Sequence, residues 1–179
     1  MATDRTAVIG FPVDHSLSPI IHNHWIKELG LDTKPYEKIN VDPNKFEEQI
    51  NNLKAEGYGG LNVTVPLKEL AFSISDETSG VSKKLKSVNT LSLNSEKIDG
   101  DNTDAVGFIN SLDEKTIENN IANKKTLVLG AGGSARSVVH ALNELGGHVR
   151  LFNRTPEKAA ILLNDLSINS SPVSTEELD

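Results

Sequence analysis

The 179-residue sequence contains no cysteine. Disulfide bonds, thiolate zinc sites and cysteine nucleophiles are therefore excluded together. The absence of cysteine is also compatible with a reducing compartment, and we predict a cytoplasmic protein. His15, His22 and His24 lack further partners at the spacing of metal ligands. We therefore interpret these histidines as structural and predict no metal site.

The sequence also lacks an excess of positive charge and any long apolar run. Its formal net charge is −7, which argues against a nucleic-acid partner, because phosphate backbones select basic surfaces. No apolar run approaches membrane-spanning length, and the first residues lack the basic-then-apolar order of a secretory signal, so we expect no membrane partner. A hydrophobic fraction of 37% with 24% charged residues is typical of a soluble globular protein.

Apolar runs alternate with segments of helical period along the chain. This alternation predicts an α/β fold with largely parallel strands. In the first half, strands are expected at residues 6–9, 61–65 and 88–93. After the third strand we expect a turn at residues 94–95 and a partner strand that ends near Ile98.

Two helices are also expected in this half. The first spans residues 19–29 and carries four apolar side chains on one side, and we expect its Trp25 in the core. The second follows Asp42 and Pro43, a favourable cap and a favourable first helical residue, and ends at Gly57. The four apolar residues of the first helix are Ile20, Ile21, Trp25 and Ile26.

A second unit is expected to begin near Asp104. Strands at residues 126–129 and 149–152 flank a helix over residues 133–145, which makes one βαβ unit. We also expect Thr155 to cap a last helix and the tail from residue 167 to be polar. A complete doubly wound nucleotide domain needs roughly twice as many elements as this half offers, so we expect the second unit to be incomplete.

A glycine-rich loop joins the first of these strands to the helix. It has the form Gly-x-Gly-Gly-x-Ala, which is close to the dinucleotide-binding fingerprint, because glycines permit a tight turn and a close approach of backbone to a pyrophosphate. The alternative is a plain strand-to-helix turn in another kind of α/β protein. The residues that we expect to bind the nucleotide in this loop are Gly130, Ala131, Gly132, Gly133 and Ser134.

The end of the next strand indicates which dinucleotide is bound. NAD sites usually have an acidic residue there, whereas NADP sites have cationic groups. Here the strand ends in Asn153, Arg154 and Thr155, with Lys158 one turn further on. A guanidinium can hold a 2′-phosphate in a fork and stack on adenine, so NADP is favoured. The alternative is that Arg154 is a solvated charge near the start of a helix.

The first half contains three further polar motifs, at residues 10–23, 62–68 and 88–90, and a fourth motif joins the two halves at residues 100–104. In the first motif Ser16 and Ser18 precede a helix, where hydroxyl groups and the helix N-terminus can both favour a carboxylate. Together with the glycine loop, these motifs occur in an order that resembles the shikimate dehydrogenase family. The resemblance extends from Gly10 to about Lys158.

The resemblance implies a shikimate-binding catalytic domain over residues 1–104 and an incomplete Rossmann-like NADP-binding domain over residues 105–179. Ser16 and Ser18 would bind the carboxylate of shikimate. The ring hydroxyls would be held by Thr64, Asn89 and Asp104.

The resemblance also implies that Lys68 and Asp104 form the catalytic pair at the hydroxyl that is oxidised. An ammonium beside a carboxylate can move the hydroxyl proton and stabilise the developing oxyanion. Three simpler interpretations stay open. Lys68 could be a solvated lysine in a first helical turn, and Asp104 could be a helix cap. Asn62 and Asn89 could be residues that only fix backbone turns.

The leading hypothesis is thus NADP-dependent reduction of 3-dehydroshikimate to shikimate in aromatic amino-acid biosynthesis. The alternatives are an NAD-using quinate/shikimate dehydrogenase and a truncated shikimate-binding protein without turnover. A nucleotide sheet that lacks its second half exposes strand edges and an apolar face. We therefore expect a homodimer, a rearranged second unit or poor order beyond about Asp104.

Overall fold

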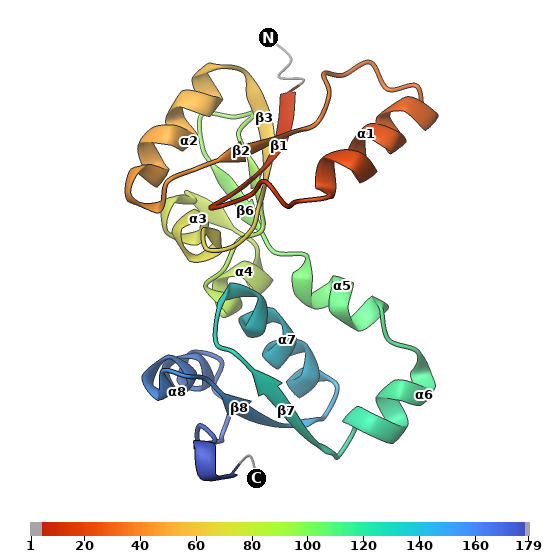
Figure 1. The fold of residues 1–179 in the computed structure, drawn as a ribbon, viewed down its shortest axis with the longest axis vertical. Coiled ribbons are helices and arrows are strands. Elements are labelled where there is room, and N and C mark those ends of the chain that lie inside the picture. The colour runs from red at the N-terminus through yellow and green to blue at the C-terminus, as the bar shows by residue number, and fades with distance from the viewer. Residues whose placement is uncertain (1–4, 178–179) are drawn as a thin grey trace. The chain divides into compact units, whose positions relative to one another are not determined.

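The computed structural model describes residues 5–177, which form the ribbon of Figure 1. The chain divides into two compact units, Met1–Asn102 and Thr103–Asp179. Both units combine helices with strands, which confirms the α/β class. Within residues 5–177, every helix is too short or too polar to cross a membrane.

The first unit contains a six-stranded sheet with the order β2-β1-β3-β5-β6-β4. β1 pairs in parallel with β2 and β3, whereas β5 is antiparallel to both β3 and β6. β4 is parallel to β6. Because β5 is antiparallel to its neighbours, the sheet is mixed rather than wholly parallel. The strands are β1 (Arg5–Gly10), β2 (Glu37–Asn40), β3 (Tyr58–Val63), β4 (Glu77–Thr78), β5 (Thr90–Ser92) and β6 (Asp99–Asp101).

Among the strand boundaries that differ from the expectation, the end of β3 and the position of the strand that pairs with β5 have a physical reason. β3 ends at Val63, two residues early, just before a cis peptide bond between Val65 and Pro66; proline has no N–H for a strand ladder. The partner of β5 begins at Asp99, so the expectation of a strand that ends near Ile98 is wrong. The Ile98 N–H donates to the Asp76 carboxylate at 2.7 Å, outside the β5–β6 ladder.

Four α-helices accompany this sheet. Asp42 caps the turn that leads into α2, and its carboxylate accepts the Asn44 N–H at 2.9 Å. Gly57, with φ of +88°, follows the end of α2 as expected. The helices are α1 (Ser18–Glu28), α2 (Phe46–Ala55), α3 (Lys68–Ile74) and α4 (Gly80–Leu85), with a 3₁₀ turn over Pro43–Lys45 before α2.

Alternate residues of β1 serve two separate cores. Ala7 and Ile9 join the main core, whose helical members include Ile50 of α2. Val8 points to the opposite face and packs with Tyr36 and other apolar residues. In Figure 1, α2 and α3 accordingly lie on one side of this sheet and α1 on the other.

α1 packs much less deeply than its apolar pattern predicts. The helix has no buried residue, and Ile26 is the member of its apolar side that packs on the small core beside Val8. Trp25 is 53% exposed, so the expectation that it belongs to the core is wrong. Its ring instead meets His22 edge-on, with ring centroids 5.5 Å apart.

The second unit contains the expected βαβ unit, in which β7 and β8 are parallel and α7 connects them. The sequence predicts that residues 113–125 are polar and surface-exposed, but Ile121 within them is buried. The elements are α5 (Asp104–Asn110), α6 (Glu114–Thr116), a π turn (Ile117–Ile121), β7 (Lys125–Leu129), α7 (Gly133–Glu144), β8 (His148–Phe152), α8 (Pro156–Asp165) and a 3₁₀ turn (Thr175–Glu177).

The tail beyond α8 is polar, but part of it joins the sheet. The Val173 N–H donates to the Leu151 carbonyl at 2.9 Å, and Pro172 forms a parallel bridge with Leu151. Val173 is buried. The tail therefore shields one edge of β8, whereas Leu127 and Leu129 of β7 remain exposed.

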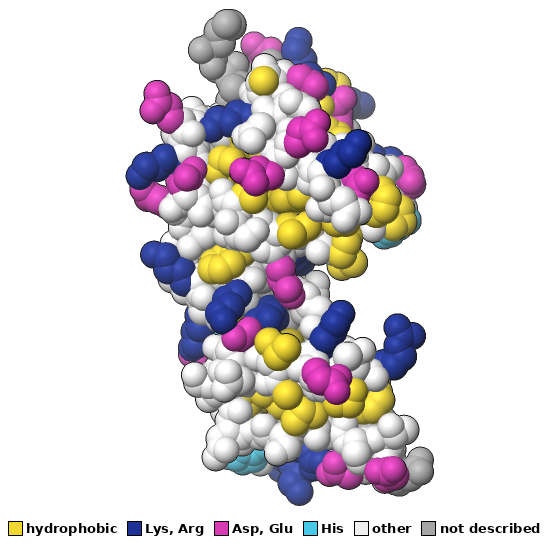
Figure 2. All heavy atoms as spheres, turned by 90° about the vertical axis from the view of Figure 1, so that its left-hand side faces the viewer, with side chains coloured by type: hydrophobic (Ala, Val, Ile, Leu, Met, Phe, Trp, Pro, Cys, Tyr) yellow, Lys and Arg dark blue, Asp and Glu magenta, His cyan; other side chains and the backbone are white. Residues whose placement is uncertain are grey.

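The surface turned toward the viewer in Figure 2 carries Lys and Arg side chains interspersed with Asp and Glu side chains. The apolar side chains on it form small groups. The visible face of neither unit is uniformly basic, in keeping with the net charge of −7.

We predict that Gly100→Ala destabilises the first unit, because a Cβ there would stand 2.8 Å from Val88 Cγ2 and closer still to the Ser75 hydroxyl. Overpacking of this kind costs about 1–3 kcal/mol of unfolding free energy. Gly80→Ala is the matched control, since its Cβ would meet nothing within 4 Å. Urea denaturation followed by Trp25 fluorescence measures both variants, and equal midpoints would contradict the close packing at Gly100.

Candidate functional site

The polar motifs of the first unit gather at the carboxyl ends of β1 and β3. The Phe11 N–H donates to the Val65 carbonyl at 3.1 Å, and the Thr64 N–H donates to the Ile9 carbonyl at 2.9 Å. These bonds hold together the segments that follow the two strands. In open parallel sheets this edge is where ligands bind.

Ser16 and Ser18 lie at the beginning of α1, in the segment that follows β1. The Ser16 hydroxyl oxygen accepts the Ser18 N–H at 3.3 Å, and the Ser16 N–H donates to the Val13 carbonyl at 2.9 Å. Both serines are half-buried. The two hydroxyl groups thus lie near the N-terminus of an 11-residue helix, which favours negative charge.

Thr64 and Lys68 follow β3. The Thr64 carbonyl accepts the Leu67 N–H at 2.9 Å, and Lys68 is the first residue of α3. Lys68 is only 7% exposed, which rules out the interpretation of a solvated lysine. The Thr64 methyl group lies against Gly10, where a Cβ would stand 2.6 Å from it. Glycine at position 10 therefore leaves room for this threonine.

Asn89 reaches the same edge from the other direction. Since β5 runs antiparallel to β3, its first residues lie at the carboxyl end of β3. The Asn89 carbonyl accepts the Val63 N–H at 2.7 Å, and the Lys68 carbonyl accepts the Val88 N–H at 2.9 Å. Thr64, Lys68 and Asn89 are therefore brought together, although 25 residues separate the first from the last.

Asn62 has a larger role than the turn that the sequence suggests. Its side-chain oxygen accepts the Tyr36 hydroxyl at 2.7 Å, and its amide nitrogen donates to the Thr90 hydroxyl oxygen at 3.5 Å. The Thr90 hydroxyl donates in turn to the Asn89 side-chain oxygen at 2.9 Å. Sequence reasoning missed Tyr36, and no local pattern around this residue signals the contact.

The motif at residues 100–104 ends in two residues with different surroundings. Asn102 is buried, and its amide donates to the Ser87 carbonyl at 2.9 Å, which ties the end of β6 to the start of β5. Asp104 belongs to the second unit and is half-buried as the first residue of α5. Thr103 occupies the capping position, so Asp104 is not the cap that the simpler interpretation requires.

In the second unit the glycine loop follows β7 and opens the 12-residue helix α7. Gly130 has φ of +109°, a conformation that suits glycine, and its N–H donates to the Phe152 carbonyl at 2.8 Å. Gly132 lies at the capping position of α7. A Cβ at either glycine would meet nothing within 4 Å, so the space above the loop is open.

Asn153 joins this loop to the end of β8. Its side-chain oxygen accepts the Ala131 N–H at 3.1 Å, and its amide donates to the Thr155 carbonyl at 2.8 Å. Arg154, Thr155 and Lys158 follow and are exposed. Thr155 occupies the capping position of α8 as expected, although its side chain makes no capping hydrogen bond.

A buried ion pair that sequence reasoning missed braces the same unit. The Arg136 guanidinium lies 2.9 Å from the Asp165 carboxylate, and both side chains are nearly buried. The pair joins the first turns of α7 to the end of α8. The 29-residue separation of its members explains why no short motif reveals it.

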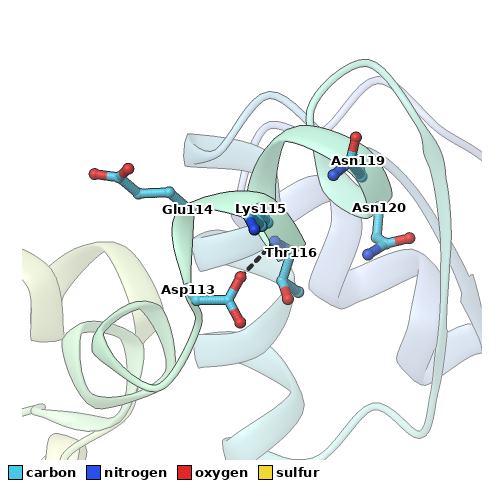
Figure 3. A pocket seen from close by; sticks show the side chains of 6 residues that line it. All are labelled: Asp113, Glu114, Lys115, Thr116, Asn119 and Asn120. Carbon is cyan, nitrogen blue, oxygen red and sulfur yellow. Dashed lines mark hydrogen bonds between the residues drawn. The ribbon is translucent and has the colours of Figure 1, made fainter.

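A surface hollow of the second unit lies apart from all predicted site residues (Figure 3). Its polar lining comes from one short helical segment, in which the Asp113 carboxylate accepts the Thr116 N–H at 2.7 Å. Within residues 5–177, no group of three or more histidine and acidic side chains could hold a metal ion. The lining residues are Asp113, Glu114, Lys115, Thr116, Asn119 and Asn120.

Comparison with known proteins gives a consistent result over both units. Residues 8–91 match the shikimate dehydrogenase substrate binding domain. The shikimate dehydrogenase (NADP(+)) of Methylocella silvestris is 43% identical over 158 residues, which cover 88% of this chain and 56% of that protein. The chain thus spans a little over half the length of the curated relatives that it matches.

Solved structures agree. Shikimate dehydrogenase from Aquifex aeolicus is 38% identical with a TM-score of 0.86, over 98% of this chain and 64% of that one. The enzyme from Thermus thermophilus, in complex with NADP(H) and shikimate, is 36% identical with a TM-score of 0.79, over 94% of this chain and 62% of that one. The fold is therefore that of an α/β protein with a Rossmann-like second unit. Over both units the chain is therefore similar to shikimate dehydrogenases.

We predict that Asp165→Ala destabilises the second unit by about 3–5 kcal/mol, because it removes the carboxylate beside a buried guanidinium. Glu177→Ala is the matched control. It removes the Glu177 carboxylate that lies 2.6 Å from Arg150 at the surface, and it should cost far less than the loss of the buried pair. Hydrogen exchange of second-unit amides measures the loss of stability in both variants. Similar losses of stability would contradict the expectation that the buried ion pair contributes more than the surface pair.

Proposed function

We propose that the chain takes part in the NADP-dependent, reversible reduction of 3-dehydroshikimate to shikimate in aromatic amino-acid biosynthesis. The observation that carries this proposal is the position of Thr64, Lys68 and Asn89 at one sheet edge, within the part of the chain that matches a shikimate dehydrogenase substrate-binding domain. Residues 1–104 would supply the substrate-binding catalytic domain, and residues 105–179 part of the NADP-binding domain.

Substrate recognition would use both charge and hydroxyl contacts. The Ser16 and Ser18 hydroxyls, beside the N-terminus of α1, suit the carboxylate of shikimate. Thr64 and Asn89 can exchange hydrogen bonds with ring hydroxyls, and Asp104 would accept one as well. This arrangement suits a small polyhydroxylated acid.

Proton transfer would fall to Lys68 and Asp104. Bound NADP supplies or accepts the hydride at the carbon that carries the reacting hydroxyl. The Lys68 ammonium would stabilise the oxygen as negative charge develops on it and move the hydroxyl proton together with Asp104. The burial of Lys68 supports this role, because a lysine in a partly desolvated site can serve proton transfer.

The second unit offers groups that fit a dinucleotide phosphate. Open space above Gly130 and Gly132, beside the N-terminus of α7, suits a pyrophosphate. Arg154 and Lys158 are exposed at the end of the next strand, where they can hold a 2′-phosphate. The remaining proposed cofactor contacts are Ala131, Gly133, Ser134, Asn153 and Thr155.

Binding without turnover is a second candidate function. The chain covers 56% of its Methylocella silvestris relative, and Leu127 and Leu129 are exposed on β7. An exposed apolar strand face is a place where another chain or segment could dock, so a homodimer of this chain belongs to the proposal. In this second candidate the first unit would bind shikimate while the reaction stays slow.

The direct test is a spectrophotometric assay of the 179-residue chain with shikimate and NADP⁺, accompanied by calorimetric titration of shikimate. Rapid formation of NADPH would support the enzyme and dismiss the binding protein. Shikimate binding without turnover would support the second candidate. If the chain neither forms NADPH nor binds shikimate, the proposal is wrong. Faster turnover of quinate with NAD⁺ would favour the quinate/shikimate alternative.

We predict that Lys68→Ala lowers turnover by about 10²–10⁴-fold and leaves NADP⁺ affinity unchanged, because general acid–base assistance typically contributes that much. Lys45→Ala, an exposed lysine of the same unit, is the control and should retain the wild-type rate. Steady-state kinetics and nucleotide titration measure both. A wild-type rate in the Lys68 variant would remove its catalytic role.

We predict that Arg154→Ala weakens NADP⁺ binding by about 10–100-fold without changing NAD⁺ binding, because hydrogen bonds to a charged phosphate are worth about 1.5–3 kcal/mol. The control is Arg150→Ala, which removes a nearby arginine that pairs with Glu177. Parallel titrations with the two nucleotides give the ratio. An equal loss of NAD⁺ and NADP⁺ affinity would show that Arg154 does not recognise the 2′-phosphate.

A further inference from the structure

A series of hydrogen bonds leads from Tyr36 to the proposed substrate edge. The Tyr36 hydroxyl donates to Asn62 Oδ1 at 2.7 Å, and Asn62 Nδ2 donates to Thr90 Oγ1 at 3.5 Å. The Thr90 hydroxyl donates to Asn89 Oδ1 at 2.9 Å. All four residues belong to the first unit.

The start of this series is held rigidly. The Tyr36 N–H donates to Asn23 Oδ1 at 2.7 Å, and the Asn23 amide donates to the Tyr36 carbonyl at 3.0 Å. The ring of Tyr36 stacks on His22, with centroids 4.1 Å apart and planes 11° from parallel. Tyr36 is itself buried and packs in the small core with Val8. α1 and the sheet therefore fix where its hydroxyl lies.

The series runs in one direction only. The Tyr36 phenol donates its single proton to the oxygen end of the Asn62 amide. The nitrogen end then faces Thr90, whose single proton is directed to Asn89 Oδ1. Burial raises the pKa of the Tyr36 phenol well above its usual range, so the hydroxyl remains a donor at physiological pH.

We propose that Tyr36 is a positioning residue that sets the orientation of the Asn89 side-chain amide. Because Thr90 donates to Asn89 Oδ1, Nδ2 is the donor end of this amide. A ligand that approaches that end would need an oxygen that can accept a hydrogen bond. This inference rests on the proposed function, in which that oxygen is a ring hydroxyl of shikimate. Tyr36 acts through Asn62 and Thr90 and need not contact the substrate.

Tyr36→Phe is the decisive variant because it removes the hydroxyl and keeps the ring on His22. Without the phenol proton, the Asn62 amide can rotate end for end, and the Thr90 hydroxyl loses its fixed direction. Asn89 should then sample both amide orientations. We expect shikimate affinity to fall by about three- to tenfold, the loss that follows from one net neutral hydrogen bond.

Tyr58→Phe is the matched control, since Tyr36 and Tyr58 are the only two tyrosines in the sequence. Tyr58 is also buried, and its hydroxyl donates to Glu37 at 2.5 Å and accepts from Arg5 at 2.7 Å. Those contacts lead away from Asn89. Tyr58→Phe therefore loses a buried hydroxyl of the same kind, and its affinity for shikimate should remain that of the wild type.

Two measurements test the inference. In the ligand-free chain, ¹⁵N NMR of the Asn89 side-chain amide should shift in Tyr36→Phe and stay unchanged in Tyr58→Phe. Calorimetric titration of shikimate should show that the affinity loss caused by Tyr36→Phe disappears when Asn89 is already alanine. A merely structural role would lower the melting temperature and leave the full affinity loss in the Asn89→Ala background.

The outcomes separate this inference from the function on which it rests. An unshifted Asn89 amide in Tyr36→Phe would overturn the positioning role whether or not the chain binds shikimate. If the wild-type chain binds no shikimate, the proposed function fails, while the NMR comparison still decides whether Tyr36 orients Asn89. A Tyr36→Phe loss that is as large with Asn89→Ala as without it would also overturn the inference.

Discussion

The candidate site depends on the backbone hydrogen bonds that close the carboxyl edge of the first sheet. The Thr64 N–H donates to the Ile9 carbonyl, and the Val63 N–H donates to the Asn89 carbonyl. These bonds join strands that lie far apart in the sequence and leave the side chains beyond the strand ends beside one another. No single motif could form the site by itself, because each motif contributes only one or two polar groups.

In the second unit, backbone hydrogen bonds also join the segments at the carboxyl ends of two strands. The Gly130 N–H donates to the Phe152 carbonyl, and Asn153 completes the edge by accepting the Ala131 N–H. With β7 and β8 as its two paired strands, this sheet has little apolar cover, and the exposed Leu129 is the consequence. The buried pair of Arg136 and Asp165 then fastens α8 to α7 through charge.

Much of this arrangement could be predicted from the sequence, because the relevant signals are local. The glycine loop, the Asp42 cap and the βαβ unit each occupy a short stretch with a known periodicity or turn preference. Trp25 could not be placed in this way: an apolar pattern on a helix says which side is apolar, but not how much of that side finds a partner. The contacts of Tyr36 and Arg136 could not be predicted for a different reason. Their partners lie 26 and 29 residues away in the sequence and meet them only in the folded chain.

The proposed contacts divide unequally between the units, and this division has a functional consequence. Those with the carboxylate and most of the ring come from the first unit, where Ser16, Thr64 and Asn89 follow strands of one sheet. The proposed proton transfer would also use Asp104, the first residue of α5. Under this proposal, substrate binding would depend on the geometry of a single sheet edge, whereas turnover would depend also on how well the second unit holds α5 and the nucleotide. Changes that loosen the second unit should reduce turnover before they reduce substrate binding, because they leave the first sheet edge intact.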